Sequence, residues 1–179
     1  MQWLGYIVVI NALTYRRTGG CMLVDRPRFF LLLFPVSAAF WWCFEYLNRY
    51  VQNWYYVGQH YGAWEYFWAV LPQFATVMPA VLGTQEWLRS FERLDGAFAR
   101  FQPIRFRRPR AVAGAVLGVS ALGLAGIGVW PDYLFPLIWL SPGLLLVSLH
   151  ALEGERHVLS DIAVGDWRPA VSAALASVL

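Results

Sequence analysis

The residues most able to do chemistry lie in an aromatic stretch at positions 40–56. If this stretch is helical, Glu45, Asn48 and Arg49 share one face, because residues three and four positions apart are neighbours on a helix. Glu45 precedes Arg49 by four residues, which is the order that favours an ion pair. A carboxylate that follows a long apolar run needs such a partner. We therefore predict that Glu45 pairs with Arg49.

This polar face has two interpretations. The aromatic residues around it are typical of the belt that membrane proteins carry at the membrane–water interface, and Glu45 and Arg49 would then be an internal tie. Alternatively, the polar face and its aromatic walls form a pocket for an amphipathic ligand, because belts seldom carry Glu, Asn and Arg together. The residues expected to form that pocket, under a roof of the last two, are Glu45, Asn48, Arg49, Asn53, Trp54 and Tyr55.

A second group of polar residues lies further along the chain. His150, Glu153 and His157 are spaced i, i+3 and i+7, so they would share a face of a continuous helix and could bind zinc or iron with a ligand such as Glu86. The spacing is not that of the HExxH motif, and the simpler interpretation is that these residues solvate a helix end. The sequence also lacks a glycine-rich phosphate loop, CxxC and GxSxG. We expect no metal and no cofactor.

Apolar helices must position these residues. The chain is 59% hydrophobic and only 14% charged, far from the balance of a soluble domain. A membrane span needs ~20 mostly apolar residues, and the stretches that satisfy this are 29–47, 64–82, 111–130 and 133–152. Apolar runs at 1–13 and 170–179 are shorter. The sequence predicts an all-α, polytopic transmembrane bundle with four full spans and partial spans at both ends. Residues 1–179 would be a single integral membrane domain and a fragment of a longer one.

Arginine predicts the orientation of the spans. All 14 basic residues are arginine, and Arg49 is the only one outside three segments between the spans. Because basic loops stay in the cytoplasm, we expect a bacterial inner-membrane protein whose cytoplasmic segments are 14–28, 83–110 and 153–169. Arginine placed in this way indicates topology rather than a nucleic-acid surface. The expected partners are membrane lipids and an amphipathic small molecule.

Three local patterns add expectations about packing. Apolar residues at helical spacing predict an amphipathic helix over 85–99, lying on the cytoplasmic membrane surface. Gly114 and Gly118 form a GxxxG motif, which predicts that their helix is buried among its neighbours. Pro72 and Pro79 fall within one span and should loosen its hydrogen-bond ladder.

The aromatic stretch also has a familiar form. The pattern F-E-x-x-N at 44–48, followed by N-W-x-Y at 53–56, resembles a family of uncharacterised multi-span bacterial membrane proteins. The likeness covers about a third of the chain, and this chain resembles only the N-terminal part of the family. It implies a second F-W-E-x-W-N-like segment further along, which would make Glu45 one of a pair. The resemblance implies no biochemical activity.

Three functions stay open at this point. The first is a membrane protein that holds a lipid-like or amphipathic ligand in an aromatic and polar pocket near the outer leaflet. The second is an integral membrane enzyme that acts on a lipid or isoprenoid with Glu45 as the acid/base. The third is a small-solute transporter, because ionisable groups within spans also suit such proteins.

Overall fold

Long apolar helices dominate the chain. The computed structural model describes residues 2–57 and 60–179, and these contain helices but no strands. Among the described residues four helices are long and apolar enough to cross a membrane, namely α3 (Pro27–Val51), α4 (Ala63–Arg89), α6 (Pro109–Gly126) and α8 (Pro136–Glu153). Their positions match the four apolar stretches, so the prediction of an all-α bundle with four full spans is confirmed. Pro27, Pro109 and Pro136 each stand in a first turn, where the missing N–H costs no hydrogen bond.

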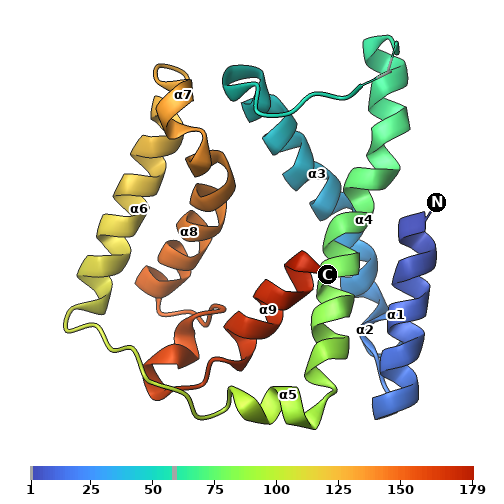
Figure 1. Ribbon diagram of the computed structural model, residues 1–179, viewed down its shortest axis with the longest axis vertical. Helices are drawn as coiled ribbons and strands as arrows, with labels where there is room; N and C mark the ends of the chain where they lie inside the picture. The colour runs from blue at the N-terminus through green and yellow to red at the C-terminus, as the bar shows by residue number, and fades with distance from the viewer. Residues whose placement is uncertain (1, 58–59) are drawn as a thin grey trace.

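Helix α4 is the centre of one half of the molecule. It packs against α3 and against two shorter helices, α1 (Gln2–Thr18) and α9 (Arg168–Val178), which lie beside it in Figure 1. With 17 residues, α1 rises ~25 Å, less than the ~30 Å of membrane hydrocarbon. Gly83 lets α1 approach closely, because a Cβ there would lie 3.2 Å from Ile10. The two apolar ends of the chain are therefore short helices docked on α4.

The other half is a hairpin of α6 and α8, joined by the short helix α7 (Pro131–Leu134) (Figure 1). Gly123 and Gly126 of α6 make room for α8 and α7, since a Cβ on either would overlap a leucine side chain. The GxxxG pair does not do this. Gly114 and Gly118 are exposed, and a Cβ added to either would meet no atom within 4 Å, so the prediction that this motif is buried is wrong. The reason is that α6 turns a different face inward, on which Ala113 and Ser120 are buried and Gly123 lies against Leu137 of α8.

The hairpin meets the rest of the protein through α3. Phe44, Ile127 and Ile138 form a buried cluster in which α3, the end of α6 and the start of α8 come together. The phenyl ring of Phe44 also stacks on Trp139 of α8, with ring centroids 5.4 Å apart. This contact lies near the end of α3 that leads into residues 52–57. The hairpin is therefore anchored beside the aromatic stretch.

A serine of α3 bonds to the backbone of α4 in the turn before Pro79. The hydroxyl of Ser37, on α3, donates to the carbonyl of Phe74 and accepts from the amide of Met78 at 3.1 Å. In an unbroken helix that amide would bond to that carbonyl directly. Proline pushes away the carbonyl four residues before it and opens the preceding turn, and a side chain can enter such a gap. The Ser37 hydroxyl bridges these two backbone groups where the sequence predicts a loosened ladder.

The segment predicted as one amphipathic helix is two helices at an angle (Figure 1). Helix α4 continues to Arg89 and α5 (Glu92–Ala97) begins after a break, so the prediction of a continuous helix over 85–99 is wrong. The break occurs because the Ser90 hydroxyl donates to the carbonyl of Trp87 at 2.6 Å and in turn accepts from Arg17 at 2.9 Å. Hydroxyls that bond to local backbone in this way compete with the helix.

The arginine-rich segments gather at one end of the bundle. Figure 1 shows α5, the stretch before α6 and the stretch between α8 and α9 at the end opposite to α7. Two stretches are held together by backbone bonds, from Phe101 to Gly165 at 2.8 Å and from Ile104 to Ile162 at 3.0 Å. Gly165 has φ +88°, and a Cβ there would lie 2.5 Å from the Phe101 carbonyl, so this position requires glycine. The short elements at this end are α2 (Met22–Asp25) and the 3₁₀ helix Ser160–Val164.

Candidate functional site

The carboxylate of Glu45 is bound by aromatic hydrogen-bond donors. Its Oε1 accepts from the indole nitrogen of Trp54 at 3.0 Å and from the hydroxyl of Tyr56. Its Oε2 accepts only a long hydrogen bond, 3.5 Å, from the hydroxyl of Tyr66. Trp54 and Tyr56 lie in the chain that follows α3, whereas Tyr66 lies on the first turns of α4. The site therefore joins three segments around one carboxylate.

The predicted ion pair between Glu45 and Arg49 is wrong. Among the described residues no salt bridge includes either side chain, and the Arg49 guanidinium instead lies over the ring of Tyr46, 5.9 Å from its centroid. Arg49 is exposed in the last turn of α3, where a cation is stabilised by the helix dipole and needs no carboxylate. Indole and phenol donors satisfy Glu45 in its place. The spacing of the two residues allows an ion pair, but the aromatic donors around Glu45 bind its carboxylate instead.

Asn48 turns the chain back towards Glu45. Its Oδ1 accepts from the amides of Asn53 (2.8 Å) and Trp54 (3.3 Å), and its Nδ2 donates to the carbonyl of Trp54 at 2.7 Å. Between them Gln52 adopts a left-handed conformation, φ 47° and ψ 40°, which ends α3. All the hydrogen bonds that the structure gives the Asn48 side chain go to this backbone. Asn48 therefore positions Trp54 beside Glu45.

The start of α4 is fixed from the other side. Glu65 reaches back to accept a hydrogen bond from the Gly62 amide at 3.1 Å, which satisfies one of the free amides where the helix begins. Tyr66 follows directly and faces α3, where its ring packs edge-on against Trp42 at 6.2 Å. Trp42 also stacks on Phe67, with centroids 5.2 Å apart and planes 17° apart. These rings form an aromatic wall between the two helices.

A cavity of about 850 Å³ lies at this junction of α3 and α4. The residues that line it are Trp42, Glu45, Tyr46, Asn48, Arg49, Gln52, Trp54, Tyr55, Ala63, Tyr66 and Phe67. Five of the six residues expected to form the pocket are among them, and Asn53 is not. The two residues expected to form its roof both line it, but Trp54 packs on Trp139 at 5.1 Å whereas the Tyr55 side chain is 84% exposed. We refer to this space as the aromatic cavity.

Sequence reasoning missed Tyr56 and Tyr66 as ligands of the carboxylate. Both stand far enough from Glu45 in sequence that only the tertiary fold brings them to it. Partial burial, together with the hydrogen bond and the negative charge of Glu45, raises the pKa of the Tyr56 hydroxyl above its ordinary value. Tyr56 therefore stays protonated at neutral pH and remains a donor. A carboxylate surrounded by tyrosines in neighbouring segments was the one available signal.

The metal hypothesis on α8 fails because the helix ends too early. Gly154 adopts φ 81° directly after Glu153, and the amide of Glu155 closes the end by donating to the carbonyl of His150 at 2.8 Å. His157 therefore lies beyond the helix, where its Nδ1 accepts from the Leu159 amide at 3.3 Å. Within residues 2–57 and 60–179 no group of three His, Cys, Asp or Glu side chains is placed to hold a metal.

The extra ligand suggested for that metal serves another contact. Glu86 accepts a hydrogen bond from the amide of Met22 at 2.8 Å and lies 3.9 Å from the guanidinium of Arg26. The neighbouring amide, that of Leu23, donates to Asn11 at 3.3 Å. Glu86 and the buried Asn11 thus fasten the first turn of α2 to α4 and α1.

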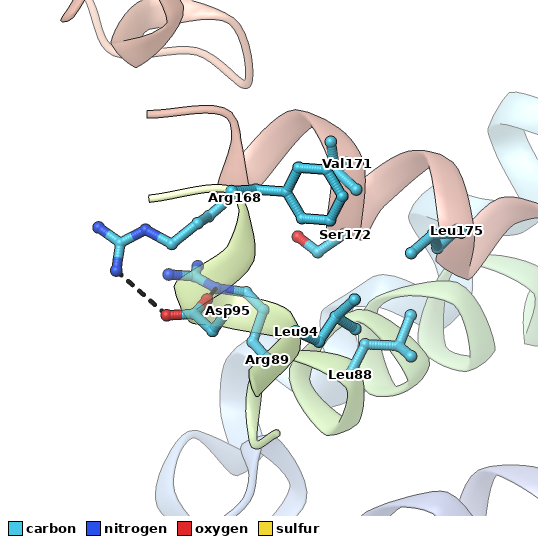
Figure 2. Close-up of a pocket in the computed structure, with 9 residues that line it drawn as sticks. Leu88, Arg89, Leu94, Asp95, Arg168, Val171, Ser172 and Leu175 are labelled. Carbon is cyan, nitrogen blue, oxygen red and sulfur yellow. Dashed lines mark hydrogen bonds and ion pairs between the residues drawn. The ribbon is translucent and has the colours of Figure 1, made fainter. Parts of the chain in front are cut away.

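A second set of charges at the arginine-rich end holds α9 in place. Arg168 donates to Asp95 at 3.1 Å, as drawn in Figure 2, and it also donates to both carboxylate oxygens of Asp166, at 2.9 and 2.7 Å. These bonds lower the pKa of Asp166 to about 2 and raise that of Arg168. The space beside them is only about 10 Å³, which is room for one water molecule. This cluster is therefore a structural contact between α5 and α9.

Comparison with protein-family models, curated proteins and solved structures gives no match. The resemblance through F-E-x-x-N and N-W-x-Y stays a prediction. The geometry of the aromatic cavity is therefore the basis of the functional argument.

Proposed function

We propose that this chain is a multi-pass protein of the bacterial inner membrane whose aromatic cavity binds the polar end of a lipid-like, amphipathic molecule. The observation that supports this proposal is the carboxylate of Glu45, held by aromatic donors at the wall of a cavity of about 850 Å³. Ligand sites of ~300–1,000 Å³ with apolar walls and a few placed polar groups are typical of small-molecule binding. The arginine-rich end faces the cytoplasm, so the cavity opens near the outer leaflet.

The position of the cavity suits an amphipathic ligand. It lies where α3 ends and α4 begins, between Glu45 within the span and Gln52 beyond it. Tryptophan and tyrosine accumulate at this depth because their rings prefer the boundary between hydrocarbon and headgroups. A ligand bound here can place its polar end in the cavity and its apolar chains along the lipid-facing sides of the helices.

An enzyme with Glu45 as the acid/base is the alternative, and the hydrogen bonds argue against it. A carboxylate has about four acceptor positions, and three of them already hold donors from Trp54, Tyr56 and Tyr66. Within the described part of the chain one acceptor position, on Oε2, remains open for a ligand. Three donors already hold the carboxylate in place, so the arrangement favours a fixed recognition group over a residue that takes up and releases protons. A small-solute transporter has no particular contact in its favour.

Lipid retention tests the proposal. The chain is purified in a nonionic detergent, and the molecules that survive detergent exchange are extracted and measured by mass spectrometry per mole of protein. The wild-type chain should retain an amphipathic molecule in a near one-to-one ratio. Trp54→Ala should lose it, because the indole both forms the wall and binds Glu45.

Trp3→Ala is the matched control, since Trp3 is a half-exposed tryptophan on α1 and does not line the aromatic cavity. Helix content by circular dichroism verifies that both variants fold. Equal retention in all three proteins, or no retained molecule in the wild type, would overturn the proposed function.

A further inference from the structure

The aromatic cavity contains charges of both signs that do not neutralise each other. Glu45 and Arg49 both line it, yet no salt bridge joins them in the described part of the chain. Their positions differ by four residues, so their Cα atoms lie ~6 Å apart along the helix axis. Opposite charges this close and inside a membrane protein usually pair, because unpaired charge is expensive there. Their separation leaves each one able to bind a ligand group of opposite sign.

The surroundings of each charge indicate what it can bind. Among the described residues Glu45 Oε2 has only the long contact with Tyr66, so it can accept one more donor. Aromatic rings adjoin it, and rings beside a carboxylate attract an ammonium group through cation–π interactions. Arg49 is exposed at the cavity rim next to Gln52, and a guanidinium binds phosphate oxygens through paired hydrogen bonds.

We propose that the ligand of the aromatic cavity carries a zwitterionic phospho-amine headgroup, with its ammonium at Glu45 and its phosphate at Arg49. This inference rests on the proposed function and names the ligand class. An anionic headgroup would satisfy Arg49 but meet the negative charge of Glu45. An uncharged headgroup would offer neither side chain an opposite charge. Only a headgroup with both charges on a short spacer satisfies the two side chains together.

Short-chain lipids with identical acyl chains provide the test. The full chain in nonionic detergent is titrated calorimetrically with dihexanoyl-phosphatidylethanolamine, whose ammonium carries N–H donors, and with dihexanoyl-phosphatidylglycerol and dihexanoylglycerol, each below the concentration at which it aggregates. The zwitterionic lipid should bind at least about tenfold more tightly than either of the others. Glu45→Gln should remove the preference over the anionic lipid, and Arg49→Gln should remove the preference over the uncharged one.

Glu92→Gln serves as the control for a removed carboxylate, because Glu92 is exposed on α5 and should leave all three affinities unchanged. Equal affinity of the wild type for the three lipids would overturn this inference and leave the proposed function standing. Binding of none of them would overturn both. Unchanged selectivity in folded Glu45→Gln and Arg49→Gln proteins would show that these charges do not bind the headgroup, and it would overturn this inference.

Discussion

Two buried serines allow a direct measurement of what the hydrogen bonds from Ser37 to α4 contribute to stability. Ser37 and Ser141 both have side chains that are 0% exposed, and both lie within membrane-spanning helices. The Ser37 hydroxyl makes two hydrogen bonds with the backbone of α4, whereas the Ser141 hydroxyl has no partner among the described residues. Ser37→Ala and Ser141→Ala therefore remove the same atom from equally buried positions and differ in the bonds lost.

The expected magnitudes follow from this difference. Hydrogen bonds between helices in a membrane contribute ~0.6 kcal/mol on average and up to ~1.7 kcal/mol each. With two bonds lost and two backbone groups of α4 left without their partner, Ser37→Ala should lower the free energy of unfolding by about 1–3 kcal/mol. Ser141→Ala removes an unsatisfied hydroxyl, so it should change that free energy by less than ~0.5 kcal/mol or raise it slightly.

Unfolding in mixed micelles measures both variants. Sodium dodecyl sulfate is titrated into the protein in nonionic detergent, and the loss of native structure is followed by circular dichroism and tryptophan fluorescence. The midpoint for Ser37→Ala should fall while that for Ser141→Ala stays with the wild type. Equal midpoints for the two variants would refute the reasoning, because they would show that α4 closes its own ladder beside Pro79 once the hydroxyl is gone.

Three further results are expected. Glu45→Ala should lower the free energy of unfolding by about 1–3 kcal/mol, because it leaves three hydrogen-bond donors without their acceptor. In the same titration the effects of Glu45→Ala and Arg49→Gln should add within ~0.5 kcal/mol in the double variant, since a larger coupling would require an ion pair. The pKa of Asp166 is lowered from 3.8 to about 2, so its contribution to stability is present above pH 3.8 and is lost as the pH falls towards 2. Cleavage of the segment after α8 by an acid-active protease should therefore speed up over this pH range. Asp166→Asn should weaken this pH dependence, and an unchanged profile would contradict the argument. Reporter fusions after residues 104 and 132 should give cytoplasmic and periplasmic signals, and the reverse readings would contradict the proposed topology.

The spans could be predicted because the information that specifies them is local. Length and apolar composition suffice to identify a helix that crosses a membrane, and α3 and α8 begin and end within a few residues of the stretches read from the sequence. The end of α8 was also readable. Gly154 follows Glu153 directly, and a glycine at that position commonly ends a helix in a left-handed conformation. A helix that ends at this glycine places His157 outside it, so His157 cannot share a helix face with His150.

The partners of Glu45 could not be predicted because they depend on a turn that the sequence does not mark. The chain reverses at Gln52, a residue other than glycine with φ 47°, and this conformation returns Trp54 and Tyr56 to α3. Left-handed conformations are uncommon outside glycine and cannot be inferred from glutamine. The prediction that the GxxxG motif is buried was wrong for a similar reason, since small residues permit close packing but do not determine which helix packs against them.

The walls of the aromatic cavity and the packing of the hairpin depend on the same residues. Trp139 of α8 contacts both Phe44 and Trp54, and Trp54 in turn donates to Glu45. Elsewhere α8 packs mainly on α6, so this aromatic contact is a principal link between the hairpin and the half of the molecule centred on α4. A ligand that orders Trp54 must therefore also favour the position of α8 in which Trp139 packs against it, because binding can shift a structure only through contacts that differ between its states. The cavity is thus placed where occupation would tie the two halves of the bundle together.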